Sequence, residues 1–141
     1  MAKSNGEGRL VGPLLNWLQE KRRVRCDTII LRELPWFGRR VDLVTLTCSG
    51  ITTAYELKLN NNRRAIQQAG YNKLVFDRSY VVTLSEPTME NLKHARDVGV
   101  GFIVIGNDSV RMLQESPTSP VRVTLRRQLL RTIKGRMEPD V

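Results

Sequence analysis

Two short apolar segments, residues 80–84 and 102–105, constrain the fold most, because a helix-forming segment separates them. Both segments are rich in β-branched and aromatic residues, a composition typical of buried strands. Between them, Pro87 and Thr88 open a helix that extends to about residue 98, with the proline in its first turn. A strand, a helix and a second strand in this order form a right-handed crossover between neighbouring parallel strands. The chain is therefore predicted to fold as an α/β protein.

The other segments predict an antiparallel meander before this crossover, and helices at both ends of the chain. A basic, amphipathic C-terminal helix is expected over about 121–137, and a turn over 35–38. We expect a single domain over residues 1–141, with its core at about 9–113. Further strands are expected at about 25–34, 41–48, 51–59 and 110–113, and further helices at about 10–23 and 63–75.

The composition favours a globular protein that binds a polyanion. Hydrophobic residues make up 40% and charged residues 26% of the 141 residues, and no apolar run is long enough for a membrane span or a signal peptide. A cytoplasmic location is therefore expected. Cys26 and Cys48 are isolated and His94 is the only histidine, so a zinc site is not expected. A net charge of +9 favours nucleic acid as a partner through counterion release.

Three charged residues lie in the two strands of the predicted second hairpin. Side chains alternate across a strand, so Glu56 and Lys58 share one face while Leu57 faces the other way. A hairpin centred on Ser49-Gly50 places Asp42 opposite roughly residue 57, close to both charged side chains. Each residue alone has an ordinary explanation as a solvated strand position. Together they predict a site in which two carboxylates bind Mg²⁺ or Mn²⁺.

Such a site has a specific chemical use. A hard divalent cation polarises a phosphoryl oxygen and lowers the pKa of a bound water. A desolvated lysine such as Lys58 stabilises developing negative charge or assists in deprotonating the attacking water. The predicted chemistry is therefore the hydrolysis of a phosphodiester bond.

The motifs around these residues resemble the PD-(D/E)XK nuclease superfamily, which has a restriction-endonuclease-like fold. The resemblance covers about residues 28–106, and it implies a three-layer architecture with a central mixed sheet of about five strands between helices. Val41 stands where the motif has its proline. The segments that carry the resemblance are Gly38-Arg39-Arg40-Val41-Asp42-Leu43-Val44, Tyr55-Glu56-Leu57-Lys58-Leu59 and Gln67-Gln68-Ala69-Gly70-Tyr71.

The third segment resembles the Gln-x-x-x-Tyr element of the RecB-like branch. Gln67 and Tyr71 share one helical face, and the family implies that this helix packs beside the metal site and helps to position nucleic acid or the catalytic groups. The resemblance further implies that Asp42, Glu56 and the backbone carbonyl of Leu57 bind Mg²⁺ or Mn²⁺. The implied activity is structure-selective or weakly sequence-specific cleavage of DNA, in repair, recombination or the processing of phage or mobile-element DNA.

Members of the superfamily often add a glutamate from the first helix, and three candidates compete here. Glu7 faces the core if the helix extends back past Pro13; if the helix begins at Pro13, Glu7 lies in a loop and can still reach inward. Glu20 falls on the opposite face and is expected to be solvated. Glu33, in the first strand, is a ligand, a partner of Arg39 or Arg40, or without a role.

Several basic residues are expected to contact phosphate. Arg39 and Arg40 lie just before the expected strand that carries Asp42. Arg63 and Arg64 begin the expected helix that carries Gln67. The C-terminal helix is the least certain contact, because its apolar face predicts docking on the sheet or on a second subunit. Its basic residues are Arg122, Arg126, Arg127, Arg131, Lys134 and Arg136.

The sequence is compatible with more than one role for two aromatic residues, more than one activity and more than one assembly. Trp36 and Phe37 are hydrophobic anchors by default, although in a turn they could stack on a base. A DNA-binding or assembly module that keeps the fold without turnover is the alternative to an enzyme, and an RNA nuclease would use the same chemistry. A homodimer and a companion targeting protein are both compatible with the sequence.

Overall fold

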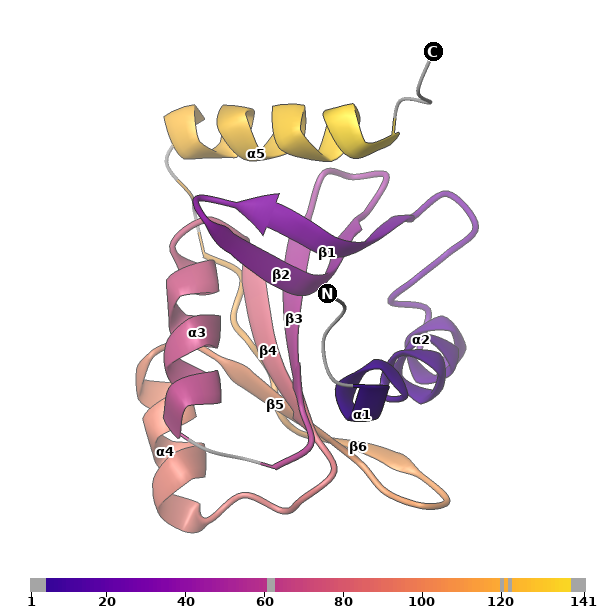
Figure 1. The fold of residues 1–141 in the computed structure, drawn as a ribbon, viewed down its shortest axis with the longest axis vertical. Helices are drawn as coiled ribbons and strands as arrows, with labels where there is room; N and C mark the ends of the chain where they lie inside the picture. Colours follow the sequence, from indigo (N-terminus) through magenta and orange to yellow (C-terminus); the bar gives the residue numbers. More distant parts are fainter. Residues whose placement is uncertain (1–4, 61–62, 120, 122, 138–141) are drawn as a thin grey trace.

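One mixed six-stranded sheet organises the fold (Figure 1). The computed structural model describes residues 5–60, 63–119, 121 and 123–137. The strands follow one another across the sheet in chain order. They are β1 (Ile29–Trp36), β2 (Arg39–Leu46), β3 (Thr52–Lys58), β4 (Arg78–Thr83), β5 (Gly101–Ile105) and β6 (Val110–Gln114).

The strand directions combine a meander with two crossovers. β1, β2 and β3 pair antiparallel, β3, β4 and β5 pair parallel, and β6 returns antiparallel to β5. The crossover expected between residues 80 and 105 is confirmed. The sheet has six strands, not the count of about five that the family resemblance implies, because the expected strand at 110–113 also pairs with β5.

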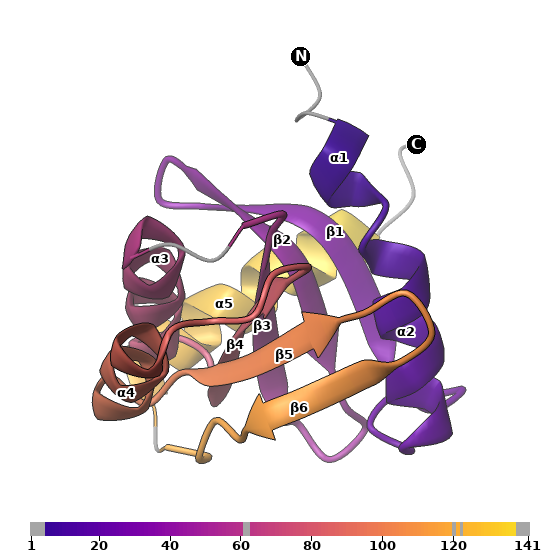
Figure 2. The ribbon, with the colours of Figure 1, turned by 90° about the horizontal axis from the view of Figure 1, so that it is seen from below.

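Helices cover both faces of the sheet, so the fold has three layers (Figure 2). One face packs against α2, and the other packs against α3 and α4 at one end and α5 at the other. The helices are α1 (Asn5–Gly8), α2 (Val11–Glu20), α3 (Arg63–Lys73), α4 (Met89–Asp97) and α5 (Val123–Met137). Of the residues described, no helix is long and apolar enough to cross a membrane.

The alternation of side chains in β3 separates the two layers. Tyr55 and Leu57 pack in the core beneath α2, whereas Ala54 belongs to the core beneath α5. Glu56 and Lys58 have the same parity as Ala54. The two charged residues therefore leave β3 on the face opposite Tyr55.

The predicted N-terminal helix is broken into two. α1 ends at Gly8 and α2 begins at Val11, which puts Pro13 in the first turn of α2, where its missing N–H is tolerated. The helix does extend back past Pro13, as one of the two alternatives has it, but it ends short of Glu7, which lies in a separate short helix. α4 begins at Met89 after the N-cap Thr88, so Pro87 lies just before the helix and not in its first turn.

The first hairpin turns two residues later than expected. Pro35 and Trp36 pair with Arg40 and Arg39 as the end of β1, and the turn is Phe37-Gly38 with both φ angles positive. Proline is tolerated there because β1 is an edge strand. Trp36 is buried in the core, while Phe37 is 74% exposed at the tip of the hairpin.

The C-terminal helix docks on the sheet, as its apolar face predicts. Leu129 and Ile133 are buried in the core that contains Leu34 and Trp36. Arg126 donates two hydrogen bonds to the buried carboxylate of Asp77, both at 3.0 Å, and one to the carbonyl of Gly50. Asp77 also accepts from the N–H of Thr52 at 2.8 Å. These contacts fasten α5 to the starts of β3 and β4.

Candidate active site

The two predicted metal-binding carboxylates lie at facing positions of β2 and β3. The last backbone pair between these strands is Leu43 with Tyr55, which places Asp42 opposite Glu56 and not opposite residue 57 as expected. The hairpin loop causes this difference, because Thr47 and Ile51 are bonded to each other across it and its centre is Ser49. Asp42 is 4% exposed and Glu56 is 2% exposed. The structure therefore buries two acidic groups side by side.

A hydrogen bond joins Asp42 to the segment that carries the other two residues. Asp42 Oδ2 accepts from the backbone N–H of Leu57 at 2.8 Å. This side-chain bond comes directly after the last backbone pair of the two strands, so it continues the ladder where the backbones stop pairing. Asp42 is thus held in fixed register with Glu56, Leu57 and Lys58.

Glu7 reaches the same region from α1. Its Oε2 lies 3.8 Å from Lys58 Nζ, and both side chains are roughly three-quarters buried, being 21% and 23% exposed. Packing of Leu59 around Gly6 brings α1 this close, since a Cβ at Gly6 would lie 2.6 Å from the Leu59 side chain. Of the three candidate glutamates, Glu7 is the one beside Lys58. Glu20 is exposed on α2, as expected.

Glu33 forms an irregularity in β1 next to Asp42. The pairing passes from Arg32 with Leu43 to Leu34 with Val41, and it omits Glu33, whose φ is +51°. A positive φ at a non-glycine residue is costly, and such irregularities re-aim side chains next to active sites. The Glu33 carboxylate forms an ion pair with Arg40 at 3.1 Å. Of the alternatives weighed for Glu33, the structure places it as a partner of Arg40.

The donor set at this site suits a hard cation. Burying two carboxylates at facing positions is unfavourable unless a positive charge lies with them. Oxygen donors without histidine or cysteine are the ligands that Mg²⁺ and Mn²⁺ prefer. Within the described part of the chain, no three His, Cys, Asp or Glu side chains are grouped closely enough to bind a metal ion together. The set therefore fits a cation that takes two carboxylates and completes its shell with backbone oxygen and water.

The Gln-x-x-x-Tyr element lies on the outer surface of α3. Gln67 is exposed, and Tyr71 is 59% exposed with the guanidinium of Arg39 at 5.7 Å from its ring centre. Arg39 also donates to the backbone oxygen of Gln68 at 3.3 Å and to Oδ1 of Asn72 at 3.4 Å. α3 is thereby fixed to the start of β2, the strand that carries Asp42.

The sequence did not single out Asn72. In the structure its side chain is 1% exposed, and its Oδ1 accepts a hydrogen bond from Arg39. A polar residue at a core position of the 63–75 helix is the only signal that could have drawn attention to it. The partner residue could not be predicted, because it lies on another element 33 positions away.

The predicted phosphate-contacting residues divide into two groups. Arg126 and Arg136 form hydrogen bonds that hold α5 on the rest of the protein. Arg126 donates to Asp77, and Arg136 donates to the carbonyls of Arg32 and Glu33. Arg64 is exposed at the start of α3, and Arg63 forms an exposed ion pair with Glu90 at 3.4 Å. Arg122 lies outside the described residues. Besides Arg136, the exposed basic residues of α5 are Arg127, Arg131 and Lys134.

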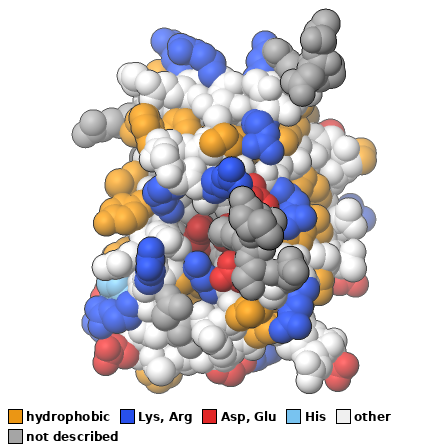
Figure 3. All heavy atoms as spheres, in the orientation of Figure 1, with side chains coloured by type: hydrophobic (Ala, Val, Ile, Leu, Met, Phe, Trp, Pro, Cys, Tyr) orange, Lys and Arg blue, Asp and Glu red, His pale blue; other side chains and the backbone are white. Residues whose placement is uncertain are grey.

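Charged side chains are unevenly distributed on one face of the molecule. Figure 3 shows acidic side chains near the middle of one face, with Lys and Arg side chains distributed around them. The positive charge on this face would attract a polyanion.

Comparisons with known proteins establish the fold and leave the family open. No protein-family model matches this chain, and no curated protein matches it. The SPO1766 protein of unknown function from Silicibacter pomeroyi is similar in structure, with a TM-score of 0.62, 14% identity, and coverage of 96% of this chain and 88% of that one. A repair endonuclease from Pyrococcus abyssi is similar at a TM-score of 0.51 and 20% identity, over 75% of this chain and 48% of the endonuclease.

A third similar structure, Pyrococcus furiosus SfsA in complex with Ca²⁺, has a TM-score of 0.45 and 18% identity, covering 80% of this chain and 65% of that one. At identities of 14% and 20%, the similarities to the Silicibacter pomeroyi protein and the Pyrococcus abyssi endonuclease concern the fold alone. The chain shares an α/β fold with a repair endonuclease, consistent with the restriction-endonuclease-like architecture expected from its motifs.

Proposed function

We propose that this protein is a divalent-metal-dependent deoxyribonuclease of the PD-(D/E)XK superfamily, in its RecB-like branch. The observation that carries the proposal is the hydrogen bond from Leu57 N–H to Asp42, which ties Asp42 to the segment of β3 that carries Glu56 and Lys58. Two buried carboxylates and a largely buried lysine in this arrangement serve no evident packing purpose. They match the needs of phosphodiester hydrolysis.

Asp42, Glu56 and the backbone carbonyl of Leu57 would bind the cation, Mg²⁺ or Mn²⁺. When bound, such a cation supplies Lewis-acid polarisation of a phosphoryl oxygen and a water of lowered pKa. The protein's own contribution is to keep the donors rigid. The Leu57 N–H holds Asp42, and the parallel pairing of Glu56 with Val81 and Leu57 with Val82 holds the Glu56 segment.

Lys58 would act on the scissile phosphate or on the attacking water. Its side chain is roughly three-quarters buried and its Nζ has Glu7 at 3.8 Å, so the glutamate limits where the flexible lysine side chain can point. Glu7 would thus position Lys58, and it could also bind the attacking water. Gln67, Tyr71 and Arg39, together with the exposed Arg40, Arg63 and Arg64, would bind the DNA backbone around the site.

DNA is the proposed substrate for two reasons. The net charge of +9 and the basic side chains around the site favour a polyanion. A protein with the same fold over three quarters of this chain is a repair endonuclease. The protein would cleave DNA in repair, in recombination or in the processing of phage or mobile-element DNA. It would do so without reading a long recognition sequence.

The direct test is incubation of the protein with end-labelled linear, single-stranded, branched and circular DNA in Mg²⁺, Mn²⁺, Ca²⁺ or chelator. Cleavage is expected in Mg²⁺ and Mn²⁺, with little turnover in Ca²⁺ and none in chelator. Lys58→Ala should reduce the cleavage rate by about 10²-fold or more, because a group aimed at developing charge has effects of this size. DNA affinity should hardly change, since 23 basic residues are present.

The matched control is Lys93→Ala, which removes an exposed lysine that is ion-paired with Asp97 on α4. It should leave the cleavage rate within about twofold. If the wild type binds DNA but cuts none of the four forms in Mn²⁺, and Lys58→Ala changes only binding, the protein is a DNA-binding module that retains the fold. Full activity in chelator would exclude the metal site.

A further inference from the structure

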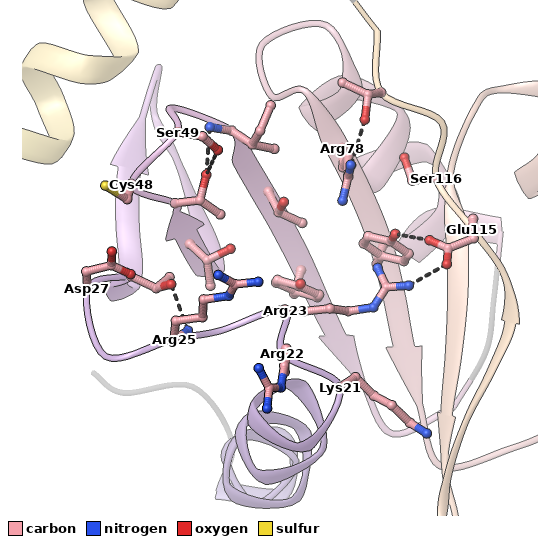
Figure 4. Close-up of a pocket in the computed structure, with 18 of the residues that line it drawn as sticks. Lys21, Arg22, Arg23, Arg25, Asp27, Cys48, Ser49, Arg78, Glu115 and Ser116 are labelled. Atoms are coloured by element: carbon pink, nitrogen blue, oxygen red, sulfur yellow. Dashed lines mark hydrogen bonds and ion pairs between the residues drawn. The ribbon is translucent and has the colours of Figure 1, made fainter.

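A large pocket lies away from the candidate metal site. It has a volume of about 1010 Å³, within the range of sites for small ligands, and it includes Thr53 and Tyr55 of β3 and Tyr80 of β4. Tyr55 and Tyr80 belong to the core beneath α2, on the face of the sheet opposite Glu56. The pocket, drawn in Figure 4, therefore lies on the face of β3 opposite the Glu56 carboxylate.

The pocket is strongly basic. Five basic side chains line it against the acidic Asp27 and Glu115, a local excess of three positive charges. The basic residues are Lys21, Arg22, Arg23, Arg25 and Arg78. Hydroxyl groups of Thr28, Thr47, Ser49 and Thr118 lie among them and can donate further hydrogen bonds.

Three of these basic residues have an ordinary structural explanation. Lys21, Arg22 and Arg23 follow the C-terminus of α2, where positive charge complements the helix dipole. Arg23 in addition forms an ion pair with Glu115, and Glu115 accepts a hydrogen bond from the Tyr80 hydroxyl at 2.8 Å. Neither the helix dipole nor this ion pair accounts for Arg25 and Arg78.

Arg25 and Arg78 come from separate segments and converge. Arg25 lies in the loop before β1, and Arg78 is the first residue of β4. Figure 4 shows both guanidinium groups pointing into the pocket from opposite sides. Among the described residues neither forms an ion pair, and the hydrogen bond of Arg78 is from Nε to Thr118 Oγ1 at 2.7 Å. The terminal nitrogens of two arginines thus face one space.

We propose that this pocket binds a phosphate group of a nucleotide or of a DNA strand end, gripped between Arg25 and Arg78. Guanidinium groups match phosphate oxygens with paired hydrogen bonds, and two of them facing each other suit a group with several oxygens. A terminal phosphate carries close to two negative charges, so it neutralises more of the local excess of positive charge than a single carboxylate does. This site is independent of the proposed nuclease activity, because no residue of the metal site lines it.

The test is calorimetric titration in chelator, so that no divalent cation contributes. The probes are inorganic pyrophosphate, thymidine 5′-monophosphate with thymidine as its control, and a short thymidine oligonucleotide with and without a 5′-phosphate. Each phosphorylated probe should bind more tightly than its unphosphorylated counterpart. Preference for the mononucleotide indicates a free nucleotide as ligand, and preference for the phosphorylated oligonucleotide indicates a strand end; either supports the pocket.

The variant Arg25→Gln with Arg78→Gln should weaken phosphate binding by at least about tenfold, since loss of a charged hydrogen bond has about that effect. The matched control is Lys93→Gln with Arg96→Gln, which removes two exposed basic residues from α4. The control should stay within about threefold of the wild type, because it changes the net charge equally without touching the pocket. Thermal unfolding of both double variants verifies that each is folded. If the Arg25→Gln, Arg78→Gln protein is not folded, the single variant Arg25→Gln replaces it in the titrations.

Equal affinity for phosphorylated and unphosphorylated probes would overturn the proposal, and so would equal losses in the two double variants. An Asp42→Asn protein that cuts no DNA should bind the phosphate probes as the wild type does. Failure of the nuclease proposal is thereby distinguished from failure of this one.

Discussion

Asp42→Asn should abolish cleavage and yet make the metal-free protein more stable. Cross-strand neighbours place their Cβ atoms about 5 Å apart, and two negative charges at about that distance repel by about 3 kcal/mol at an effective dielectric constant of about 20. The substitution removes this repulsion between Asp42 and Glu56. An asparagine oxygen can still accept from Leu57 N–H, but a neutral acceptor is weaker by about 1 kcal/mol. Lost attraction to Lys58 costs about another 1 kcal/mol.

The expected net gain is about 1 kcal/mol, which corresponds to a rise in melting temperature of about 3 °C for a chain of this size. A divalent cation should reverse the order. At about 100 times its Kd, a ligand of the folded state adds about 2.7 kcal/mol, and this gain requires both carboxylates. The wild type should therefore become the more stable protein in saturating Mg²⁺ or Mn²⁺, while Asp42→Asn should not respond.

Thermal and urea unfolding, each with chelator and with divalent cation, measure the four stabilities. Asp97→Asn is the control, because it changes an exposed carboxylate that pairs with Lys93 and should shift stability by less than about 0.5 kcal/mol. An Asp42→Asn protein less stable than the wild type in chelator by 1 kcal/mol or more would refute the repulsion argument. Equal stabilisation of both proteins by the cation would refute the assignment of Asp42 as a ligand.

Three further predictions concern other residues. Glu7→Ala should slow cleavage of labelled DNA far more than Glu20→Ala, because Glu7 lies 3.8 Å from Lys58 Nζ and Glu20 is exposed on α2; equal, mild effects would remove Glu7 from the site. Asp77→Ala should lower the free energy of unfolding in urea by about 3 kcal/mol, since it strips the buried Thr52 N–H and Arg126 of their acceptor. A loss below 1 kcal/mol would show that α5 is held by its apolar face alone. Burial alone would raise the pKa of Glu115, but hydrogen bonds from Arg23 and Tyr80 outweigh it and lower that pKa below the ordinary 4.5. The stability difference between wild type and Glu115→Gln should thus be constant above about pH 5 and vanish as pH falls through the folded-state pKa; a difference unchanged at pH 3 would contradict this.

The parts of the fold that follow from local sequence were predictable. Strand β3 alternates apolar and charged residues, so the common face of Glu56 and Lys58 follows from the pleat alone. The crossover through α4 follows from two apolar strands with a helix between them. Both patterns are short-range and are read along a single segment.

Features that depend on contacts between distant segments were not predictable in the same way. The register of the β2–β3 hairpin differs by one residue from expectation, because the conformation of the Thr47–Ile51 loop decides it. Glu7 lies near Lys58 although α1 and α2 are separate helices, and the periodicity of the sequence did not predict this break. The use of Arg126 by Asp77, 49 positions away, changes a basic residue from a phosphate contact into a structural clamp. Nothing in the local sequence distinguishes Arg126 from its exposed neighbour Arg127.

The pleat of β3 gives the two proposed sites their independence. Glu56 and Lys58 leave the strand toward one face, while Thr53 and Tyr55 leave it toward the pocket on the other. A substitution that shifts the backbone of β3 should therefore disturb both sites, whereas a side-chain change should disturb only the site on its own face. Loss of cleavage together with phosphate binding identifies damage to the strand, and loss of one alone identifies damage to a site. Measuring both activities on every variant thus separates a residue that acts on substrate from one that only supports the sheet.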